Sequence, residues 1–130
     1  MKKWSGSWKG SKKRRKQIKY VKNAPLHIKI KFMTAPLSKE LRKKYNRRNI
    51  GVIEGDKVKI IRGQFKKTSG KVAKVNTKRQ RIYIEGAELV KKDGSKTQYP
   101  IHPSNVMITE MKIEDKKRKK ILDRKAKGAK

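Results

Sequence analysis

The feature that most constrains this chain is its excess of positive charge. Its 130 residues include 41 Lys and Arg but only 10 Asp and Glu, which gives a formal net charge of +31. A compact chain with so much charge of one sign repels itself, so we expect it to fold stably against a polyanion. RNA, DNA and an anionic membrane are the three candidate polyanions.

The charge is unevenly distributed along the chain. Residues 1–50 hold 18 basic residues and one acidic residue, whereas residues 51–110 hold 13 and 6, and residues 111–130 hold 10 and 3. Only 33% of the residues are hydrophobic, so the core must be small. We therefore expect one domain in the middle of the chain, with basic flanks.

Several classes of protein are disfavoured by what the sequence contains. Its longest apolar runs, such as 106–108, are far shorter than the roughly 20 residues of a membrane-spanning helix. No apolar stretch follows the basic first residues, which predicts no signal peptide and a cytosolic or nucleus-like location. The absence of Cys excludes disulfides, thiolate catalysis and Cys-ligated zinc.

Strand signals gather in the middle of the chain. In residues 56–62, apolar and basic residues alternate, with Val58 and Ile60 on one face, as in a half-buried strand. Residues 71–76 and 81–85 show the same pattern. Between the first two runs lies a loop, 63–70, whose bounding glycines can adopt positive φ.

A hairpin and a final strand complete this pattern. The dipeptide Asp93-Gly94 predicts a tight turn between strands at 88–92 and 96–99. A last strand is expected at 105–109, after a turn at 102–104. Short strands separated by frequent turns favour a small antiparallel barrel of five or six strands.

The flanks predict different structures. Ser38 can cap a short helix that ends at Tyr45, with Leu37, Leu41 and Tyr45 forming an apolar stripe that packs on the barrel. A second helix is expected over 114–127, with Glu114/Arg118 and Asp115/Lys119 pairs and a stop at Gly128. Residues 1–24 have too little apolar periodicity to bury a core, so we expect them to become ordered only on RNA.

Residues 55–72 resemble the KOW motif, a two-strand unit with a glycine-containing loop found in ribosomal proteins and transcription elongation factors. Together with 81–92, they are similar to the universal large-subunit ribosomal protein twenty-four, called twenty-six in eukaryotes. The archaeal and eukaryotic branch is indicated by 23–27 with 35–45, and by 101–106 with 118–127. Lys67 departs from the pattern, because bacterial members commonly carry Gly there, which puts the bacterial loop conformation in doubt.

The resemblance implies a mainly β fold, with a small SH3-like antiparallel barrel that carries the KOW motif. The expected divisions are a basic extended N-terminal segment (1–36), a short helix and linker (37–49), the barrel (50–110) and a basic C-terminal helix and tail (111–130). The resemblance also implies a structural protein that binds large-subunit rRNA near its 5′ region. Such a protein would act early in subunit assembly and lie near the polypeptide tunnel exit. The implied partners are rRNA, neighbouring large-subunit proteins and nascent-chain factors, in the cytoplasmic ribosome.

The residues themselves suggest how RNA would be held. Gly63 and Gly70 would let the backbone approach RNA, while nearby cations contact phosphates and Thr68 and Ser69 donate hydrogen bonds to phosphate or a 2′-hydroxyl. An ordinary hairpin turn without a ligand is the alternative. The full set of candidate RNA-binding residues is Trp4, Trp8, Lys12, Lys13, Arg14, Arg15, Lys16, Lys19, Lys22, His27, Lys43, Lys44, Arg47, Arg48, Arg62, Gly63, Lys66, Lys67, Thr68, Ser69, Gly70, Lys71, Lys78, Arg79 and His102.

Some of these candidates have more than one interpretation. Trp4 and Trp8 could stack on unpaired bases or pack against the barrel. The basic run 12–16 could also be a solvated charge run or an import signal. His27 and His102 are far apart in sequence and have no Cys or second His nearby, so we expect no metal site.

Enzymatic activity is not expected. Four carboxylates lie beside strand lysines, which explains them as salt bridges or as protection of strand edges: Glu54, Asp56, Glu85 and Glu88. We find no nucleophile with a base and no cofactor motif. Two other functions remain open: a KOW-domain transcription or assembly factor that binds RNA transiently, and a histone-like DNA compactor, which would leave the loop unexplained.

Overall fold

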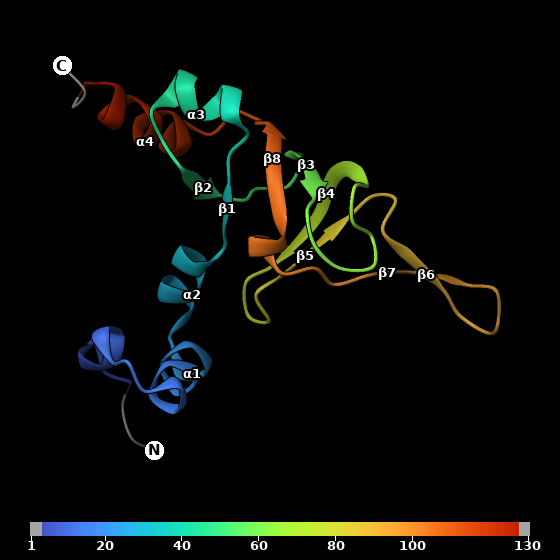
Figure 1. Ribbon diagram of the computed structural model, residues 1–130, viewed down its shortest axis with the longest axis horizontal. Coiled ribbons are helices and arrows are strands. Elements are labelled where there is room, and N and C mark those ends of the chain that lie inside the picture. The colour runs from blue at the N-terminus through green and yellow to red at the C-terminus, as the bar shows by residue number, and fades with distance from the viewer. Residues whose placement is uncertain (1–3, 128–130) are drawn as a thin grey trace.

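The computed structural model describes residues 4–127, which form a mixed helix and sheet fold (Figure 1). In this part of the chain there are four α-helices, eight strands in three antiparallel sheets, and two short 3-10 helices. The elements in chain order are η1 (Gly6–Gly10), α1 (Arg14–Asn23), α2 (Leu26–Phe32), β1 (Thr34–Pro36), α3 (Lys39–Tyr45), β2 (Asn49–Gly51), β3 (Lys57–Ile60), β4 (Ser69–Asn76), β5 (Arg81–Ile84), β6 (Glu88–Val90), β7 (Lys96–Gln98), η2 (Pro103–Asn105), β8 (Val106–Glu110) and α4 (Lys116–Lys127).

The central sheet has four strands in the order β5-β4-β3-β8. In β3, Val58 and Ile60 are buried whereas Lys57 and Lys59 are exposed, as the alternating sequence predicts. Val58 lies opposite Gly70 of β4 and Ile108 of β8, so β3 is hydrogen-bonded on both edges. The predicted positions of these four strands are confirmed to within a few residues.

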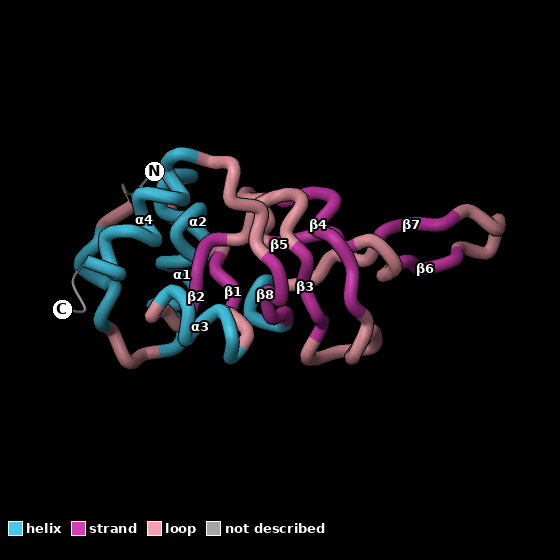
Figure 2. The backbone as a smooth tube through the Cα atoms, turned by 90° about the horizontal axis from the view of Figure 1, so that it is seen from above, coloured by secondary structure: helices cyan, strands magenta, loops and turns pink. Residues whose placement is uncertain are grey.

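The sheet remains open within the described residues. β6 and β7 pair only with each other, and their hairpin projects away from the rest of the molecule (Figures 1 and 2). A barrel would need these strands to continue the wall and bury one face, yet all three residues of β6 are exposed. The expectation of a mainly β, SH3-like barrel is therefore not confirmed, although the hairpin at Asp93-Gly94 is present.

A short two-stranded sheet extends the core beyond the KOW-like region. β1 and β2 pair antiparallel, with Ala35 opposite Ile50, and both of these side chains are buried. The sequence analysis predicted neither strand. Leu37 follows β1 and forms a bridge to Ile108 of β8, which joins this sheet to the central one.

Helix α3 forms as predicted. The Ser38 side chain accepts a hydrogen bond from the Leu41 backbone N–H at 3.3 Å, which satisfies one of the free donors at the helix start. Leu37 is buried, and Leu41 and Tyr45 pack against the same core. The helix ends at Asn46, which adopts the left-handed conformation.

The N-terminal region differs from the expected extended segment. Two helices, α1 and α2, cover most of residues 14–32. A small aromatic cluster holds them: the ring centroids of Trp4 and Tyr20 are 5.1 Å apart, and those of Tyr20 and Phe32 are 6.0 Å apart. The Trp4 indole N–H also donates to the Tyr20 carbonyl at 3.1 Å. Three partly buried aromatic residues, far apart in sequence, thus hold together a region in which periodicity indicated no core.

The C-terminal helix α4 starts at Lys116, two residues later than predicted, because the Asp115 carboxylate accepts the Lys117 backbone N–H at 2.9 Å. The expected Glu114/Arg118 pair is not formed. Arg118 instead forms a buried bidentate ion pair with Asp56, with its two terminal nitrogens 2.6 and 2.7 Å from the carboxylate oxygens. The predicted stop at Gly128 lies outside the described residues.

Candidate nucleic-acid interface

The loop between β3 and β4 is held by backbone hydrogen bonds at its base. The Lys67 N–H donates to the Ile60 carbonyl, and the Ile60 N–H donates to the Thr68 carbonyl, both at 2.9 Å. Gly63 has a φ of +98°, as predicted, and a turn follows it. Lys67 also has a positive φ, of +77°, so it adopts a left-handed backbone that normally favours glycine.

Gly70 has a different role from the one the sequence suggested. It lies inside β4, which begins at Ser69, and its φ is not positive. A Cβ at this position would collide with the Glu85 carbonyl oxygen and would lie 3.0 Å from the Ile84 Cγ2 atom. Glycine is required here because the turn after β5 approaches the β4 backbone. The expectation that Gly70 bounds the loop in a positive-φ conformation was therefore wrong.

The loop presents its cations to solvent. Arg62, Lys66 and Lys67 are exposed, while Phe65 turns inward and packs on Tyr99 with ring centroids 5.3 Å apart. This anchored aromatic side chain, together with the backbone hydrogen bonds, holds the backbone of the loop in place. The loop therefore presents three exposed cations from a well-defined backbone.

More cations extend from the loop along the sheet. Lys71 of β4 is exposed and lies opposite Lys57 of β3, whose Nζ is 2.8 Å from the Glu110 carboxylate. At the turn between β4 and β5, Lys78 and Arg79 are also exposed. Of the two hydroxyl residues, Ser69 is exposed and Thr68 is half-buried.

Three predicted residues meet other side chains in a shallow cavity of about 220 Å³ beside the loop. Arg62, Gly63 and His102 line it, together with residues that the sequence analysis missed: Phe65, Arg81, Tyr99 and Asn105. The signal for Arg81 was its place in an alternating strand, which puts it on the face opposite Ile82. Nothing in the sequence indicated that Tyr99 and Asn105 would join it.

The protonation of His102 follows from its surroundings. Its Nδ1 atom accepts the Ser104 backbone N–H at 3.3 Å and lies 2.8 Å from the Ser104 hydroxyl. Partial burial, reinforced by the positive charge of Arg81, lowers the pKa of the imidazole from 6.5. The ring is therefore neutral near pH 7, and because Nδ1 accepts a hydrogen bond, its proton lies on Nε2.

Helix α1 lies apart from the central sheet (Figure 1) and contains no acidic residue. Together with the short segment before it, α1 carries the N-terminal cations: Lys12, Lys13, Arg14, Arg15, Lys16, Lys19 and Lys22. His27 is exposed on α2 and is not among the residues that line the cavity with His102. Trp4 packs on Tyr20 of α1 and not against the central sheet, and its stacking on an unpaired base stays a prediction. Trp8 lies in η1, and its side chain is outside the described part.

The remaining candidates lie at and after α3. Lys43, Lys44 and Arg48 are exposed. Arg47 is half-buried and donates to the Asn49 and Ile121 carbonyls at 2.9 and 3.2 Å, so its side chain joins β2 to α4. This use of Arg47 in packing was not foreseen.

The described residues contain neither a metal-binding cluster nor a membrane-spanning helix. Among residues 4–127, no group of three or more His, Cys, Asp or Glu side chains is arranged to hold a metal ion. No helix in the same described part is both long and apolar enough to cross a membrane. The four strand carboxylates include one, Asp56, that is fully buried, and it is engaged with Arg118.

A comparison with known protein families identifies the chain. Residues 11–125 match the family that comprises the eukaryotic ribosomal proteins L26 and their archaeal counterparts, numbered twenty-four. The match covers nearly the whole chain, including both helical flanks and the open sheet between them. The protein therefore belongs to this ribosomal protein family and is an RNA-binding structural constituent of the large ribosomal subunit.

Proposed function

We propose that the protein binds the 5′ region of large-subunit rRNA early in subunit assembly and lies near the polypeptide tunnel exit of the cytoplasmic ribosome. Membership of this ribosomal protein family supports the assignment to the large subunit. The rRNA contact is supported by the preformed loop, where Arg62, Lys66 and Lys67 are exposed on a backbone that is hydrogen-bonded at its base. Neighbouring ribosomal proteins and nascent-chain factors are the expected protein partners.

Two basic regions would contribute to RNA binding in different ways. The loop and the sheet around it are rigidly placed, so they determine where the protein docks, largely by the shape of the RNA. The α1 cations and the exposed lysines of α3 and α4 add attraction to phosphates that depends little on sequence. All of the candidate residues named from the sequence, except Gly70 and Arg47, keep this proposed role in direct contact with RNA.

Chemical footprinting on large-subunit rRNA tests the proposal. The full chain should protect a defined set of nucleotides in the 5′ region, and Lys66→Gln/Lys67→Gln should lose protection at the nucleotides that face the loop. The matched control is Lys91→Gln/Lys92→Gln, which removes the same charge from the exposed tip of the β6–β7 hairpin. Identical footprints for both double variants would refute the role of the loop.

Association with ribosomes separates the proposal from a transient factor. We expect the protein to sediment with mature large subunits after a high-salt wash, and to join the earliest assembly particles in pulse-labelled cells. Recovery only with RNA polymerase or with pre-ribosomal particles would instead favour the transcription or assembly factor. Comparable affinity for duplex DNA and rRNA in competition would favour a DNA compactor.

A further inference from the structure

The cavity beside the loop has a lining that general phosphate binding does not need. We name it the loop pocket and define it by Arg62, Phe65, Arg81, Tyr99, His102 and Asn105. It combines two aromatic rings, two guanidinium groups and two side chains able to bond with the edge of a base. An electrostatic contact with an RNA backbone would require only the cations.

We propose that the loop pocket binds a single unstacked RNA base together with its adjoining phosphate. This inference rests on the proposed function, because rRNA supplies the nucleotide. The inference goes beyond that function because it names a site for one nucleotide whose base is not stacked on its neighbours in the RNA. The chemical class of the ligand is a nucleoside monophosphate unit within a single-stranded or bulged segment.

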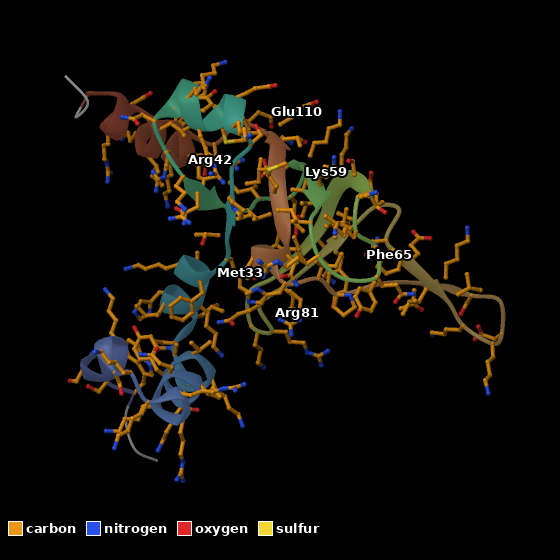
Figure 3. All side chains as sticks on the ribbon, viewed as in Figure 1. Met33, Arg42, Lys59, Phe65, Arg81 and Glu110 are labelled. Carbon is orange, nitrogen blue, oxygen red and sulfur yellow. The ribbon has the colours of Figure 1, made fainter. Side chains whose placement is uncertain are left out.

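The aromatic pair supplies the surface for the base. Phe65 and Tyr99 are tilted by 50° to each other, and both are only partly buried, so ring area remains for a third planar group. Figure 3 labels Phe65 on the loop between β3 and β4. Phe65 comes from the loop and Tyr99 from the segment after β7, so the surface exists only in the folded chain. Stacking of a base on such a ring tolerates all four bases.

The guanidinium groups supply the phosphate contact. Arg62 is exposed at the rim, and Arg81 is half-buried, with its Nη1 held by the Gln80 carbonyl at 3.1 Å. This bond orients the Arg81 fork without using all of its donors. A phosphate at the mouth of the loop pocket would meet the oriented Arg81 and the exposed Arg62.

His102 and Asn105 supply hydrogen bonds to the base edge. The neutral His102 ring carries its proton on Nε2, for which the described residues provide no acceptor. Nε2–H is therefore a donor available to a base nitrogen or carbonyl, and the Asn105 amide can both donate and accept. Hydrogen bonds to an unstacked base are the usual source of sequence preference in RNA recognition.

The size of the loop pocket fits one base better than a larger ligand. Its volume of about 220 Å³ lies below the roughly 300–1,000 Å³ typical of pockets for drug-sized molecules. A base fills a small cavity of this kind while its ribose and phosphate remain at the exposed rim.

NMR titration of the isotopically labelled full chain tests the inference with three probes: UMP, AMP and inorganic phosphate. We expect both nucleotides, at millimolar concentration, to shift signals of Phe65, Tyr99 and His102, and phosphate alone to leave the aromatic signals in place. Equal shifts with phosphate would show an anion site and overturn base binding. The absence of nucleotide shifts in the loop pocket would also overturn it, without affecting the rRNA footprint that tests the proposed function.

Variants give a second test on RNA. Tyr99→Leu keeps apolar bulk but removes the ring, and should weaken binding to a hairpin with one bulged nucleotide by at least about fivefold. Tyr99→Phe should restore this affinity, and a fully paired hairpin should bind wild type and Tyr99→Leu equally. Arg81→Gln, at a half-buried surface position, provides a variant that does not disturb the aromatic packing, and it should weaken the bulged hairpin selectively. Equal loss on both hairpins for both variants would refute the loop pocket.

Discussion

Lys67 adopts a backbone conformation that a residue with a side chain rarely occupies. Its φ of +77° lies in the left-handed region that favours glycine. The left-handed conformation costs a residue with a Cβ about 1–2 kcal/mol. An exposed cation of the loop is thus retained at some cost in stability.

Substitution of Lys67 should reveal this cost. Lys67→Gly removes the backbone strain, but it also gives the unfolded chain more conformational freedom. We therefore expect the Lys67→Gly variant to be more stable than wild type by about 0–1 kcal/mol. Lys67→Val should be less stable than wild type, because a β-branched side chain tolerates positive φ worst. Urea denaturation of the three proteins checks the order; a glycine variant clearly less stable than wild type would contradict the strained geometry.

His102 gives a pH dependence at the same scale. Its pKa is lowered from 6.5 in the folded state, so the unfolded chain binds its proton more readily. Stability should therefore be complete above pH 6.5 and should fall as the pH drops from 6.5 through the folded pKa. Denaturation between pH 7.5 and 5.5 measures this loss, and His102→Asn should show a flatter profile. Parallel profiles for the two proteins would show that His102 is not the group responsible.

At the scale of elements, the C-terminal helix is joined to the sheet by one buried ion pair. Asp56 is fully buried and Arg118 is 2% exposed. The same carboxylate accepts the Ile53 and Lys112 backbone N–H groups at 3.0 Å, and Arg118 also donates to the Lys112 carbonyl. These hydrogen bonds connect three parts of the chain around the Asp56–Arg118 pair: the turn before β3, the segment after β8, and α4.

Breaking this pair should destabilise the whole fold. Arg118→Met leaves the Asp56 charge buried without its partner and should cost about 3–5 kcal/mol of unfolding free energy. Adding Asp56→Asn in the same chain should recover part of the loss, which a double-mutant cycle by chemical denaturation measures.

The exposed Lys57–Glu110 pair provides the matched control for this cycle. Lys57→Gln should change stability by no more than about 1 kcal/mol. An Arg118→Met variant as stable as Lys57→Gln would show that α4 is held by other contacts.

At the scale of the whole molecule, charge is divided between a folded centre and helical flanks. Residues 1–24 contain ten basic residues and no acidic one. The described part of this segment folds on its own aromatic cluster and lies apart from the central sheet (Figure 1). The N-terminal cations are therefore displayed on a small helical unit, not on an extended strand of chain.

Removal of residues 1–24 should separate affinity from location. If about eight phosphates are contacted in all, binding weakens by roughly 10³ to 10⁵ between 50 and 200 mM salt. The truncated chain should bind more weakly and show a shallower dependence of log K on log salt, while the footprint around the loop persists. Titrations at several salt concentrations and a footprint of the same complex measure both. A footprint that moves would reverse the roles assigned to the flank and the loop.

Local signals in the sequence determined the four strands of the central sheet, the hairpin at Asp93-Gly94, the start of α3 at Ser38 and the excess of basic charge, but not β1 and β2. Each of these depends on residues within a few positions of one another, where alternation, turn propensity and capping act directly. The family resemblance also came from contiguous motifs, and the match over residues 11–125 confirms it.

Tertiary structure alone decided the rest, because those contacts join residues without a common period. The Trp4 indole bonds a carbonyl 16 positions away, and Asp56 pairs with Arg118 across 62 positions. The openness of the sheet, the close approach at Gly70 and the grouping of Arg81, Tyr99 and His102 also depend on how distant segments pack. The sequence by itself indicated that the protein binds RNA. The packing of distant segments decided which side chains lie close together at the proposed interface.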